Sequence, residues 1–488
     1  MAAAAPEHNP SRPSGPRALA ARVAGVSPRQ AREAPAAGGP DSVPFPVAVR
    51  AWAGIALQTF GGPAGQIAVM QRVLVDERRW IGQRRFLHAL NYCMLLPGPE
   101  AQQLAIYIGW LLNGTRGGLA AGVLFVLPGV VALLALSAIY VAFGDTAAVT
   151  ALFAGLAPAV LAIVVHAVIR VARRALPHPA LVGIAVAAFV ALAVFGVAFP
   201  VVIGVAGAVG WALGRWRAPV MARAGGGHGG EQDGPAPVIA DDALHAERPT
   251  ARRAAQVLGA GLVLWASPVV AVALLAGGGS VFVEQGLFFS GTALVTFGGA
   301  YAVLAFVAQR AVEVYGWLAP GEMVRGLALA EKTPGPLIMV VQFVAFLGAY
   351  RDPGTLDPWV AALIGALLTT WVTFVPCFLF IFLGAPHVER LRGNRALSAA
   401  LTGITAAVVG VIANLAVYFA INTLFDETGR ARLGPIDLEV PVLATVRPLE
   451  VGIALVAAAL VFGRGWSVLR TLGVCAALGL GLGLLTGG

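Results

Sequence analysis

Polar side chains gather beside two Pro-Gly-Pro sequences in an otherwise apolar chain. They are Glu100, Gln102 and Gln103 after the first sequence, and Glu331, Lys332 and Thr333 before the second. Lys332 is the only lysine among the 488 residues. An ionisable side chain within an apolar region is a functional candidate by default, so Lys332 is a candidate ligand-binding residue.

Two of these residues have an alternative role. Lys332 can instead form an ion pair with Glu331, or extend its ammonium group to the membrane interface. Glu100 can titrate and couple proton movement to transport, or it can cap the N-terminus of its own helix. The sequence leaves both alternatives open.

The Pro-Gly-Pro sequences interrupt helices that are too short to cross a membrane. Residues 86–96 and 100–112 are apolar runs of eleven and thirteen residues. At 1.5 Å per residue each run rises about 16 to 20 Å, less than a hydrocarbon core of about 30 Å. Pro97 and Pro99 remove two backbone donors, which predicts a re-entrant hairpin or a discontinuous span. Arg84, Arg85 and Arg116 fall on one side of the membrane only in the hairpin, which we therefore favour.

A break at membrane depth is tolerated where it is buried in protein or lines a watery cavity, and transporters bind substrate at such places. Freed N–H groups at helix N-termini suit an anion. Alternatively, the glycines and prolines only kink a helix that is packed among others, without binding a substrate. The predicted structural breaks are Pro63, Pro97, Pro99, Pro334 and Pro336.

The chain contains an internal duplication. TFGGP at residues 59–63 recurs as TFGGA at 296–300, Trp80 recurs as Trp317, and the two Pro-Gly-Pro sequences are likewise 237 positions apart. Three motifs at one constant offset predict two homologous halves. Residues 254–276 form an extra apolar run with no partner before the first half.

Loop charges predict that the halves are inverted. Residues 72–85 hold five arginines and two acidic residues and are basic, whereas the counterpart is neutral, with Arg310 and Arg325 against Glu313 and Glu322. Farther along the bias reverses, because the turn at 144–145 has no cation and the stretch 387–395 holds three arginines. Cytoplasmic loops are enriched in Arg and Lys, so corresponding loops are expected on opposite sides of the membrane.

Composition places the chain in a membrane. It is 58% hydrophobic and 12% charged, whereas soluble domains are about 25% charged. Continuous apolar runs of about 20 residues predict helical spans, about nine of them besides the hairpins, or up to thirteen if each broken segment crosses the membrane. We therefore predict an all-α polytopic membrane protein. Its divisions are a disordered cytoplasmic tail at 1–43, a first repeat at 44–216, a flexible cytoplasmic linker at 217–253 and a second repeat at 254–488.

Several function classes are disfavoured. The net charge of +9 comes from arginines in short segments between apolar runs, which indicates membrane topology and not nucleic-acid binding. Cys93, Cys377 and Cys475 are far apart, so neither a zinc site nor a disulfide framework is predicted, and packing is their expected role. HExxH and GxSxG motifs are absent from the sequence, so no enzymatic activity and no cofactor are predicted.

The string PGPEAQQLAIYIGW at residues 97–110, with TFGGPAGQIAVM at 59–70, closely resembles the long-chain chromate ion transporter family. The resemblance runs from about Val47 to the C-terminus and is strongest between Gln58 and Pro128. It implies two homologous domains of opposite orientation and chromate efflux. The matching signature positions are Phe60, Gly61, Gly62, Pro63, Gln66, Trp80, Pro97, Gly98, Pro99 and Gln103, then Phe297, Gly298, Gly299, Trp317, Pro334, Gly335 and Pro336. Ala300 departs from the proline of the first copy.

Together the motifs and the resemblance predict a secondary transporter that exports chromate from the cytoplasm across the bacterial inner (plasma) membrane and confers chromate resistance. Transport of sulfate or another small anion, or an anion channel of the same fold, are the alternatives. The expected partners are the oxyanion and membrane lipid, with no nucleic acid, and a homodimer is left open. The predicted substrate-binding residues are Thr59, Gly61, Gly62, Gln66, Gly98, Glu100, Gln102, Gln103, Gly298, Gly299, Lys332, Thr333 and Gly335.

Overall fold

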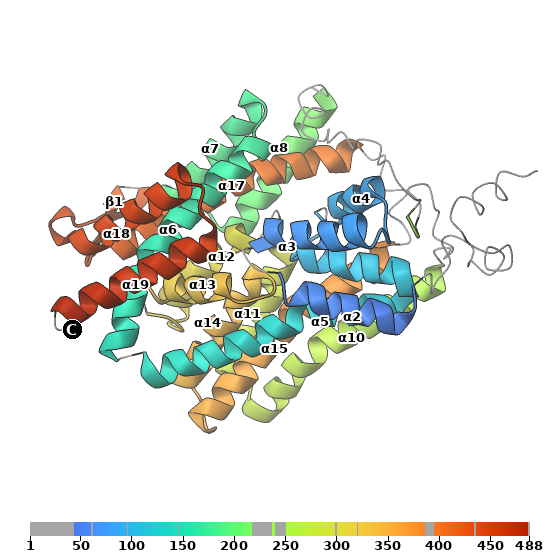
Figure 1. The fold of residues 1–488 in the computed structure, drawn as a ribbon, viewed down its shortest axis with the longest axis horizontal. Helices are drawn as coiled ribbons and strands as arrows, with labels where there is room; N and C mark the ends of the chain where they lie inside the picture. Colours follow the sequence, from blue (N-terminus) through green and yellow to red (C-terminus); the bar gives the residue numbers. More distant parts are fainter. Residues whose placement is uncertain are drawn as a thin grey trace, which may run out of the picture.

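The structure is a computed structural model that describes most of the chain. The described residues are 43–59, 62–94, 96–144, 146–216, 237–239, 250–297, 300–319, 321–385, 395–433 and 436–486. Almost all of them are helical (Figure 1). The predicted tail up to residue 42 lies outside the described residues, as do Phe60, Gly61, Gly298 and Gly299.

A series of helices occurs twice along the chain. The first series comprises α2 (Phe45–Ala56), α3 (Gly62–Gln71), η1 (Arg72–Glu77), α4 (Gln83–Cys93), α5 (Glu100–Phe143), α6 (Ala147–Ala175), α7 (Pro179–Ala193) and α8 (Phe199–Trp216). After α10 (Ala251–Ala276), the second comprises α11 (Val281–Val295), α12 (Ala300–Gln309), η3 (Arg310–Val314), α13 (Glu322–Lys332), η4 (Leu337–Met339), α14 (Val340–Arg351), α15 (Pro358–Gly384), α17 (Arg395–Leu424), α18 (Pro448–Ala458), η7 (Ala459–Gly463) and α19 (Val468–Thr486). A π-helical turn follows α3 and α12 alike, so even this uncommon element recurs.

The first Pro-Gly-Pro sequence turns the chain back on itself. The rings of Tyr92 on α4 and Tyr107 on α5 have centroids 5.6 Å apart. Fifteen residues of continuous helix would separate them by about 22 Å. The segment is therefore a helical hairpin, as the positions of the arginines predicted.

Helix α5 contains a second turn. Asn113 and Gly114 have non-helical backbone angles, with φ of +58° at Gly114. Beyond them the chain runs back along α5, because a Cβ at Gly122 would lie 2.5 Å from Cγ1 of Ile106 and one at Gly109 would lie 2.5 Å from the carbonyl O of Gly117. Small residues allow this close approach of two helices. The stretch 100–112 is thus a half-length helix, as expected.

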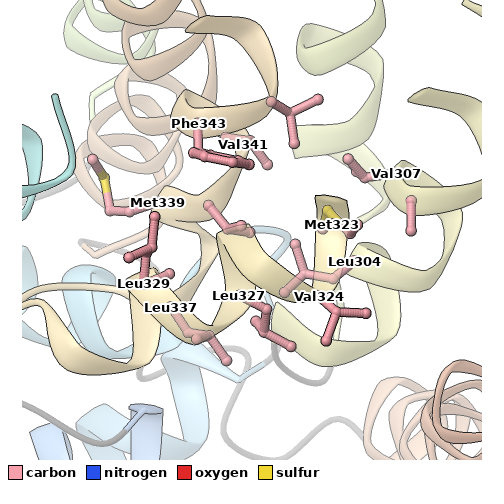
Figure 2. Close-up of a cluster of buried hydrophobic side chains, with 14 of the residues drawn as sticks. Leu304, Val307, Met323, Val324, Leu327, Leu329, Leu337, Met339, Val341 and Phe343 are labelled. Atoms are coloured by element: carbon pink, nitrogen blue, oxygen red, sulfur yellow. The ribbon is translucent and has the colours of Figure 1, made fainter. Parts of the chain in front are cut away.

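The second Pro-Gly-Pro sequence makes an equivalent hairpin from α13 and α14. Gly326 on α13 faces the ring of Phe343 on α14, across the turn. Figure 2 shows the apolar side chains that fill the space between this hairpin and α12, among them Leu304, Leu327 and Met339. All three are buried, so the hairpin is anchored by packing inside protein.

The two helix series interlock. Helix α6 packs against α18 and α19, while α17 packs against α7 and α8. Backbones approach closely at glycines, since a Cβ at Gly210 on α8 would lie 2.5 Å from the carbonyl O of Ala399 on α17. α13 lies between α6 and α14 near the centre of the view in Figure 1. The second hairpin thus packs against helices of both series.

The protein is a multi-pass membrane protein. Six of the described helices are long and apolar enough to cross a membrane, namely α5, α6, α8, α10, α15 and α17. Six further apolar helices have 10–17 residues. The prediction of about nine full spans counted some of these shorter helices as spans, because run length alone does not show where a helix ends. Helix α10 has no buried residue and packs at the edge against α11 and α15.

Two features were not predicted. Strands β1 (Thr428–Leu433) and β2 (Ile436–Pro441) form an antiparallel hairpin between α17 and α18. Within the predicted linker, Val238 and Ile239 donate backbone hydrogen bonds of 3.0 Å to the carbonyl oxygens of Arg79 and Trp80. Ile239 is buried there, so this short piece of the linker is attached to the turn that precedes α4.

Candidate anion site at the two hairpin tips

The tip of each hairpin is hydrogen-bonded to the TFGG segment of the other half. We call Pro97-Gly98-Pro99 the first tip and Pro334-Gly335-Pro336 the second tip. The N–H of Gly98 donates to the carbonyl O of Thr296 at 2.7 Å, and the N–H of Gly335 donates to that of Thr59 at 3.0 Å. Both donors and both acceptors are 237 positions apart, so the two bonds are equivalent.

The backbone properties of proline and glycine account for these hydrogen bonds. The flanking prolines have no N–H, so the glycine carries the single backbone donor of each tip. Gly98 has φ of +118° and Gly335 has φ of +107°, a region that favours glycine. Since both glycines and both threonines are buried, each donor needs a partner inside the protein.

Each tip also contacts a long helix of the opposite half, next to a proline inside that helix. A Cβ at Gly98 would lie 2.8 Å from Sγ of Cys377, which follows Pro376 in α15. A Cβ at Gly335 would lie 3.3 Å from Cα of Gly129, which follows Pro128 in α5. The first tip therefore lies against a side chain of α15, and the second tip lies against the backbone of α5.

Two glutamines fasten the tips through their side-chain NH₂ groups. Nε2 of Gln103 donates to the carbonyl O of Pro97 at 2.7 Å, and Nε2 of Gln66 donates to the carbonyl O of Gly335. Because these acceptors are carbonyls, the orientation of both amides is fixed. In each amide the other atom, Oε1, is buried and has no hydrogen-bond partner among the described residues.

The helices that start at the tips begin without a side-chain cap. Pro99 precedes α5 and Pro336 precedes η4, and neither N-terminus receives a side-chain hydrogen bond. The first turn of a helix exposes unpaired N–H groups and the positive end of the helix dipole. In the first turn of α5, Gln102 is fully buried and neither Nε2 nor Oε1 has a described partner. Buried, unpaired donors of this kind can hold an anion.

The remaining residues that were predicted to bind substrate differ in how freely their polar groups can contact an anion. Glu100 is the first residue of α5 and is half-buried. The hydroxyls of Thr59 and Thr333 donate to the carbonyl oxygens of Ala56 and Ala330, at 2.8 and 2.9 Å, so their protons are already used. Lys332 ends α13, is half-buried and forms no ion pair with a described residue.

Gly62 and Pro63 lie at the start of helix α3. Gly62 has φ of +77° and begins α3, with Pro63 in the first turn, where proline is well tolerated. Pro63 therefore lies in the first turn of a helix and not in its interior. Gly61, Gly298 and Gly299, also predicted to bind substrate, lie outside the described residues.

Sequence reasoning missed three residues that contact the tips, namely Thr296, Cys377 and Gly129. Thr296 was available from the 237-residue offset, because it is the equivalent of Thr59. Cys377 and Gly129 each follow a proline in a long apolar run, and that shared pattern was the available signal.

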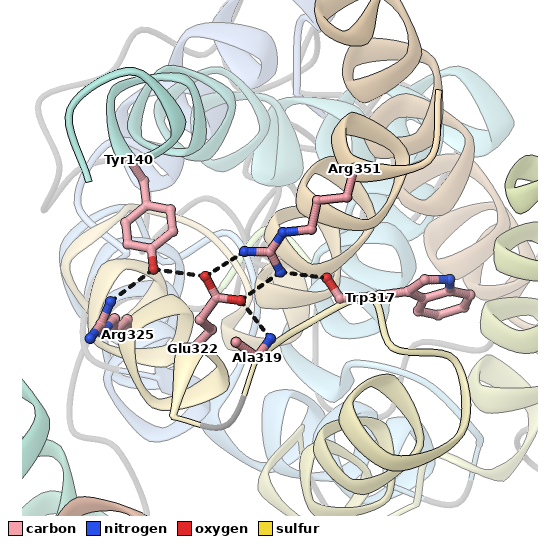
Figure 3. A network of polar contacts seen from close by, with 6 residues as sticks. All are labelled: Tyr140, Trp317, Ala319, Glu322, Arg325 and Arg351. Carbon is pink, nitrogen blue, oxygen red and sulfur yellow. Dashed lines mark hydrogen bonds and ion pairs between the residues drawn. The ribbon is translucent and has the colours of Figure 1, made fainter. Parts of the chain in front are cut away.

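A separate polar network lies at the other end of α13 and joins the two halves (Figure 3). Glu322 accepts two hydrogen bonds from Arg351, at 2.7 and 2.8 Å. It also accepts from the hydroxyl of Tyr140 on α5 at 3.0 Å and from the N–H of Ala319 at 2.7 Å. Arg325 donates to the same hydroxyl at 3.1 Å. All the acceptor sites of the Glu322 carboxylate are thus engaged within the protein.

Comparison with known proteins decides the family. The chain matches the chromate transporter family over residues 48–211 and again over 283–480. It belongs to that family. Each matched stretch contains one hairpin tip and one TFGG segment, and no solved structure matches the chain.

Individual relatives of this family member are similar over most of their length. A chromate transport protein of Pseudomonas aeruginosa is 32% identical over 447 residues, which cover 90% of this chain and 92% of that protein. A chromate transport protein of Cupriavidus metallidurans is 28% identical and covers 75% of this chain and 80% of its own length. A probable chromate transport protein of Synechococcus elongatus is 26% identical, with 75% and 82% covered. The family and its fold class, all-α and polytopic, agree with the sequence-based prediction.

Proposed function

We propose that the protein is a secondary transporter that exports chromate from the cytoplasm through the bacterial inner membrane and so confers chromate resistance. The observation that carries the proposal is that each tip is hydrogen-bonded to the TFGG segment of the other half, and we call these two tips with Thr59 and Thr296 the junction. There, uncapped helix N-termini, the buried amide of Gln102 and the amides of Gln66 and Gln103 lie in protein between the two halves. Relatives over most of the chain are named chromate transport proteins.

The electrostatics of the junction favour an anion. Helix N-termini direct positive partial charge toward it, and Lys332 supplies the ammonium group nearest in sequence to the second tip. An inside-negative potential of about 100 mV favours the exit of a dianion by about 4–5 kcal/mol. Export therefore requires no ATP. The protein can work as a uniporter or exchange the anion for protons.

We further propose that the two halves have opposite orientation in the membrane. The reciprocal bonds between tips and TFGG segments are those expected of two equivalent units around a shared centre. The reversed charge bias of corresponding loops gives the orientation. A site at the centre of such a pair can face either side as the halves rock against each other.

Chromate flux in oriented membrane vesicles tests the proposal. Wild type, Lys332→Ala and Gln103→Ala are compared in inverted and right-side-out vesicles, with Gln309→Ala as a control because Gln309 is exposed at the end of α12. We expect saturable accumulation in inverted vesicles, reduced in the two tip variants and normal in the control. Flux that does not saturate would indicate a channel, and flux of sulfate without chromate would overturn the substrate assignment.

A further inference from the structure

Each hairpin is preceded by a turn of the same shape. We call residues 78–82 the first base turn and residues 315–319 the second base turn. Arg79 has φ of +50° and Gly316, 237 positions later, has φ of +65°. The residue before each of them donates its N–H to the carbonyl O five positions earlier, at 3.0 Å in both halves. The backbones of the two base turns are therefore equivalent.

In the second half, a side chain of the same hairpin closes the base turn. Nη1 of Arg351, at the end of α14, donates to the carbonyl O of Trp317 at 3.0 Å, and Glu322 accepts two hydrogen bonds from Arg351 (Figure 3). Offset by 237 positions, Arg351 and Glu322 correspond to Gly114 and Arg85. The first half therefore has no such ion pair at the equivalent positions.

In the first half, the segment 237–239 of the predicted linker supplies the donor. We call this segment the strap. The N–H of Ile239 donates at 3.0 Å to the carbonyl O of Trp80, the atom equivalent to the Trp317 acceptor. Ile239 also lies beside Ile81 in a parallel bridge, and both side chains are buried. Extended peptides add to an exposed backbone edge in this way, with main-chain bonds for affinity and an apolar contact for a side chain.

The first base turn needs this support more than the second. Arg79 is the only residue other than glycine with a positive φ in the described part of the chain, whereas the second half has glycine at that position. A side chain at such a φ strains the backbone. The strap bonds to the strained residue directly, because the N–H of Val238 donates to the carbonyl O of Arg79 at 3.0 Å. Loss of the strap would leave the strained turn without these two hydrogen bonds.

The first base turn connects elements that contact both tips. Before it, α3 carries Gln66, whose Nε2 donates to the carbonyl O of Gly335 in the second tip. After it, α4 leads to the first tip. The turn therefore sets where α3 and α4 lie relative to each other, and a change in the turn reaches both tips.

We propose that the first base turn is a docking site for an extended apolar segment, that the strap occupies this site in the same chain, and that its detachment slows transport. The statement about transport rests on the proposed function. The arginines of residues 72–85 indicate the cytoplasmic side, where the linker is also expected. The strap is bound by two backbone hydrogen bonds and one buried isoleucine, so it can detach while the hairpin stays folded. The linker then controls, from the cytoplasm, how firmly the two tips are held.

Hydrogen exchange of the full-length protein in detergent, read by mass spectrometry, tests the docking. Ile239→Asp places a carboxylate in the apolar contact with Ile81 and should detach the strap. Leu443→Asp is the matched control, because Leu443 is 75% exposed and lies outside both hairpins. In wild type and control, the peptide that contains the strap should be protected. In Ile239→Asp its exchange should be faster by about tenfold or more, as expected when two backbone hydrogen bonds are lost.

Flux of labelled chromate in liposomes tests the effect on transport. Ile239→Asp should lower the maximal rate, and Leu443→Asp should leave it unchanged. Arg79→Gly installs the residue of the second half and removes the strain, so Ile239→Asp should lower the rate less in that background. Arg79→Ala is the comparison, because it removes the same charge but keeps a Cβ. Ile239→Ala, a milder change, should shift exchange and rate in the same direction as Ile239→Asp.

The two measurements separate this inference from the proposed function. Strap exchange in wild type that is as fast as in Ile239→Asp overturns the docking, and with it the inference. Faster strap exchange in Ile239→Asp at an unchanged chromate flux overturns the control of transport. An equal loss of flux in the Arg79→Gly and Arg79→Ala backgrounds contradicts the role assigned to strain. Absence of chromate flux in wild type overturns the proposed function, whereas the exchange measurement still decides whether the strap is docked.

Discussion

Replacement of Gly98 by alanine tests the geometry of the first tip. At φ of +118° a Cβ is strained by about 1–3 kcal/mol. The added methyl group would also lie 2.8 Å from Sγ of Cys377 and 3.0 Å from Nε2 of Gln103, and overpacking of this kind costs about 1–3 kcal/mol. We therefore expect Gly98→Ala to lower the free energy of unfolding by about 2–6 kcal/mol.

The second tip provides the matched control. Gly335 has a similar φ of +107°, but a Cβ there would meet its nearest atom, Cα of Gly129, only at 3.3 Å. Gly335→Ala should therefore cost the backbone strain of about 1–3 kcal/mol and a smaller steric cost than Gly98→Ala. The difference between the two glycine variants reports the closer contacts of the first tip, with Cys377 on α15 and Gln103 on α5.

A double-mutant cycle with Cys377→Ala completes the test. Removal of Sγ makes room for the methyl group, so Gly98→Ala should be less destabilising in the Cys377→Ala background by about 1–2 kcal/mol. The assay is equilibrium unfolding of the detergent-solubilised protein in a denaturing detergent, followed by tryptophan fluorescence. Equal costs for both glycine variants, with no coupling between Gly98 and Cys377, would refute the proposed contact between the first tip and α15.

Three further predictions concern other contacts. Glu322→Gln removes the charge that Arg351 binds. Because the Arg351 side chain is 43% exposed, the free energy of unfolding should fall by about 1–3 kcal/mol, less than for a fully buried pair. Arg351→Gln should lose a comparable amount, and the losses of the two variants should not add in the double variant. Asp357 caps α15, because its Oδ1 accepts hydrogen bonds from two backbone N–H groups. Asp357→Ala should lower the free energy of unfolding by about 0.5–2 kcal/mol, whereas Asp357→Asn should change it little. Trp265→Phe deletes the 3.0 Å hydrogen bond from α10 to the carbonyl O of Val372 and should destabilise the protein by about 0.5–1.5 kcal/mol. An unchanged midpoint would mean that packing and the bond from Trp371 to the carbonyl O of Leu264 are enough to hold α10.

Several properties of this protein follow from the sequence alone. The excess of apolar residues and the scarcity of charge require a membrane, because no soluble fold could cover so much apolar surface. The duplication follows from one constant offset. The breaks at Pro97 and Pro99 also follow, because proline removes a donor and fixes φ whatever surrounds it. Even the turn-back at the first tip was predictable, from the positions of Arg84, Arg85 and Arg116.

Other properties depended on the tertiary structure. The bond from Gly98 to Thr296 joins residues 198 positions apart, and nothing local to either residue indicates the pairing. The same holds for the contact of Gly98 with Cys377 and for the network around Glu322, whose partner Tyr140 is 182 positions away. Local rules act through the dihedral angles of a residue and its neighbours, whereas these contacts depend on how helices pack. The sequence by itself thus determined where the helices break, and only the packing of the two halves decided what each break touches.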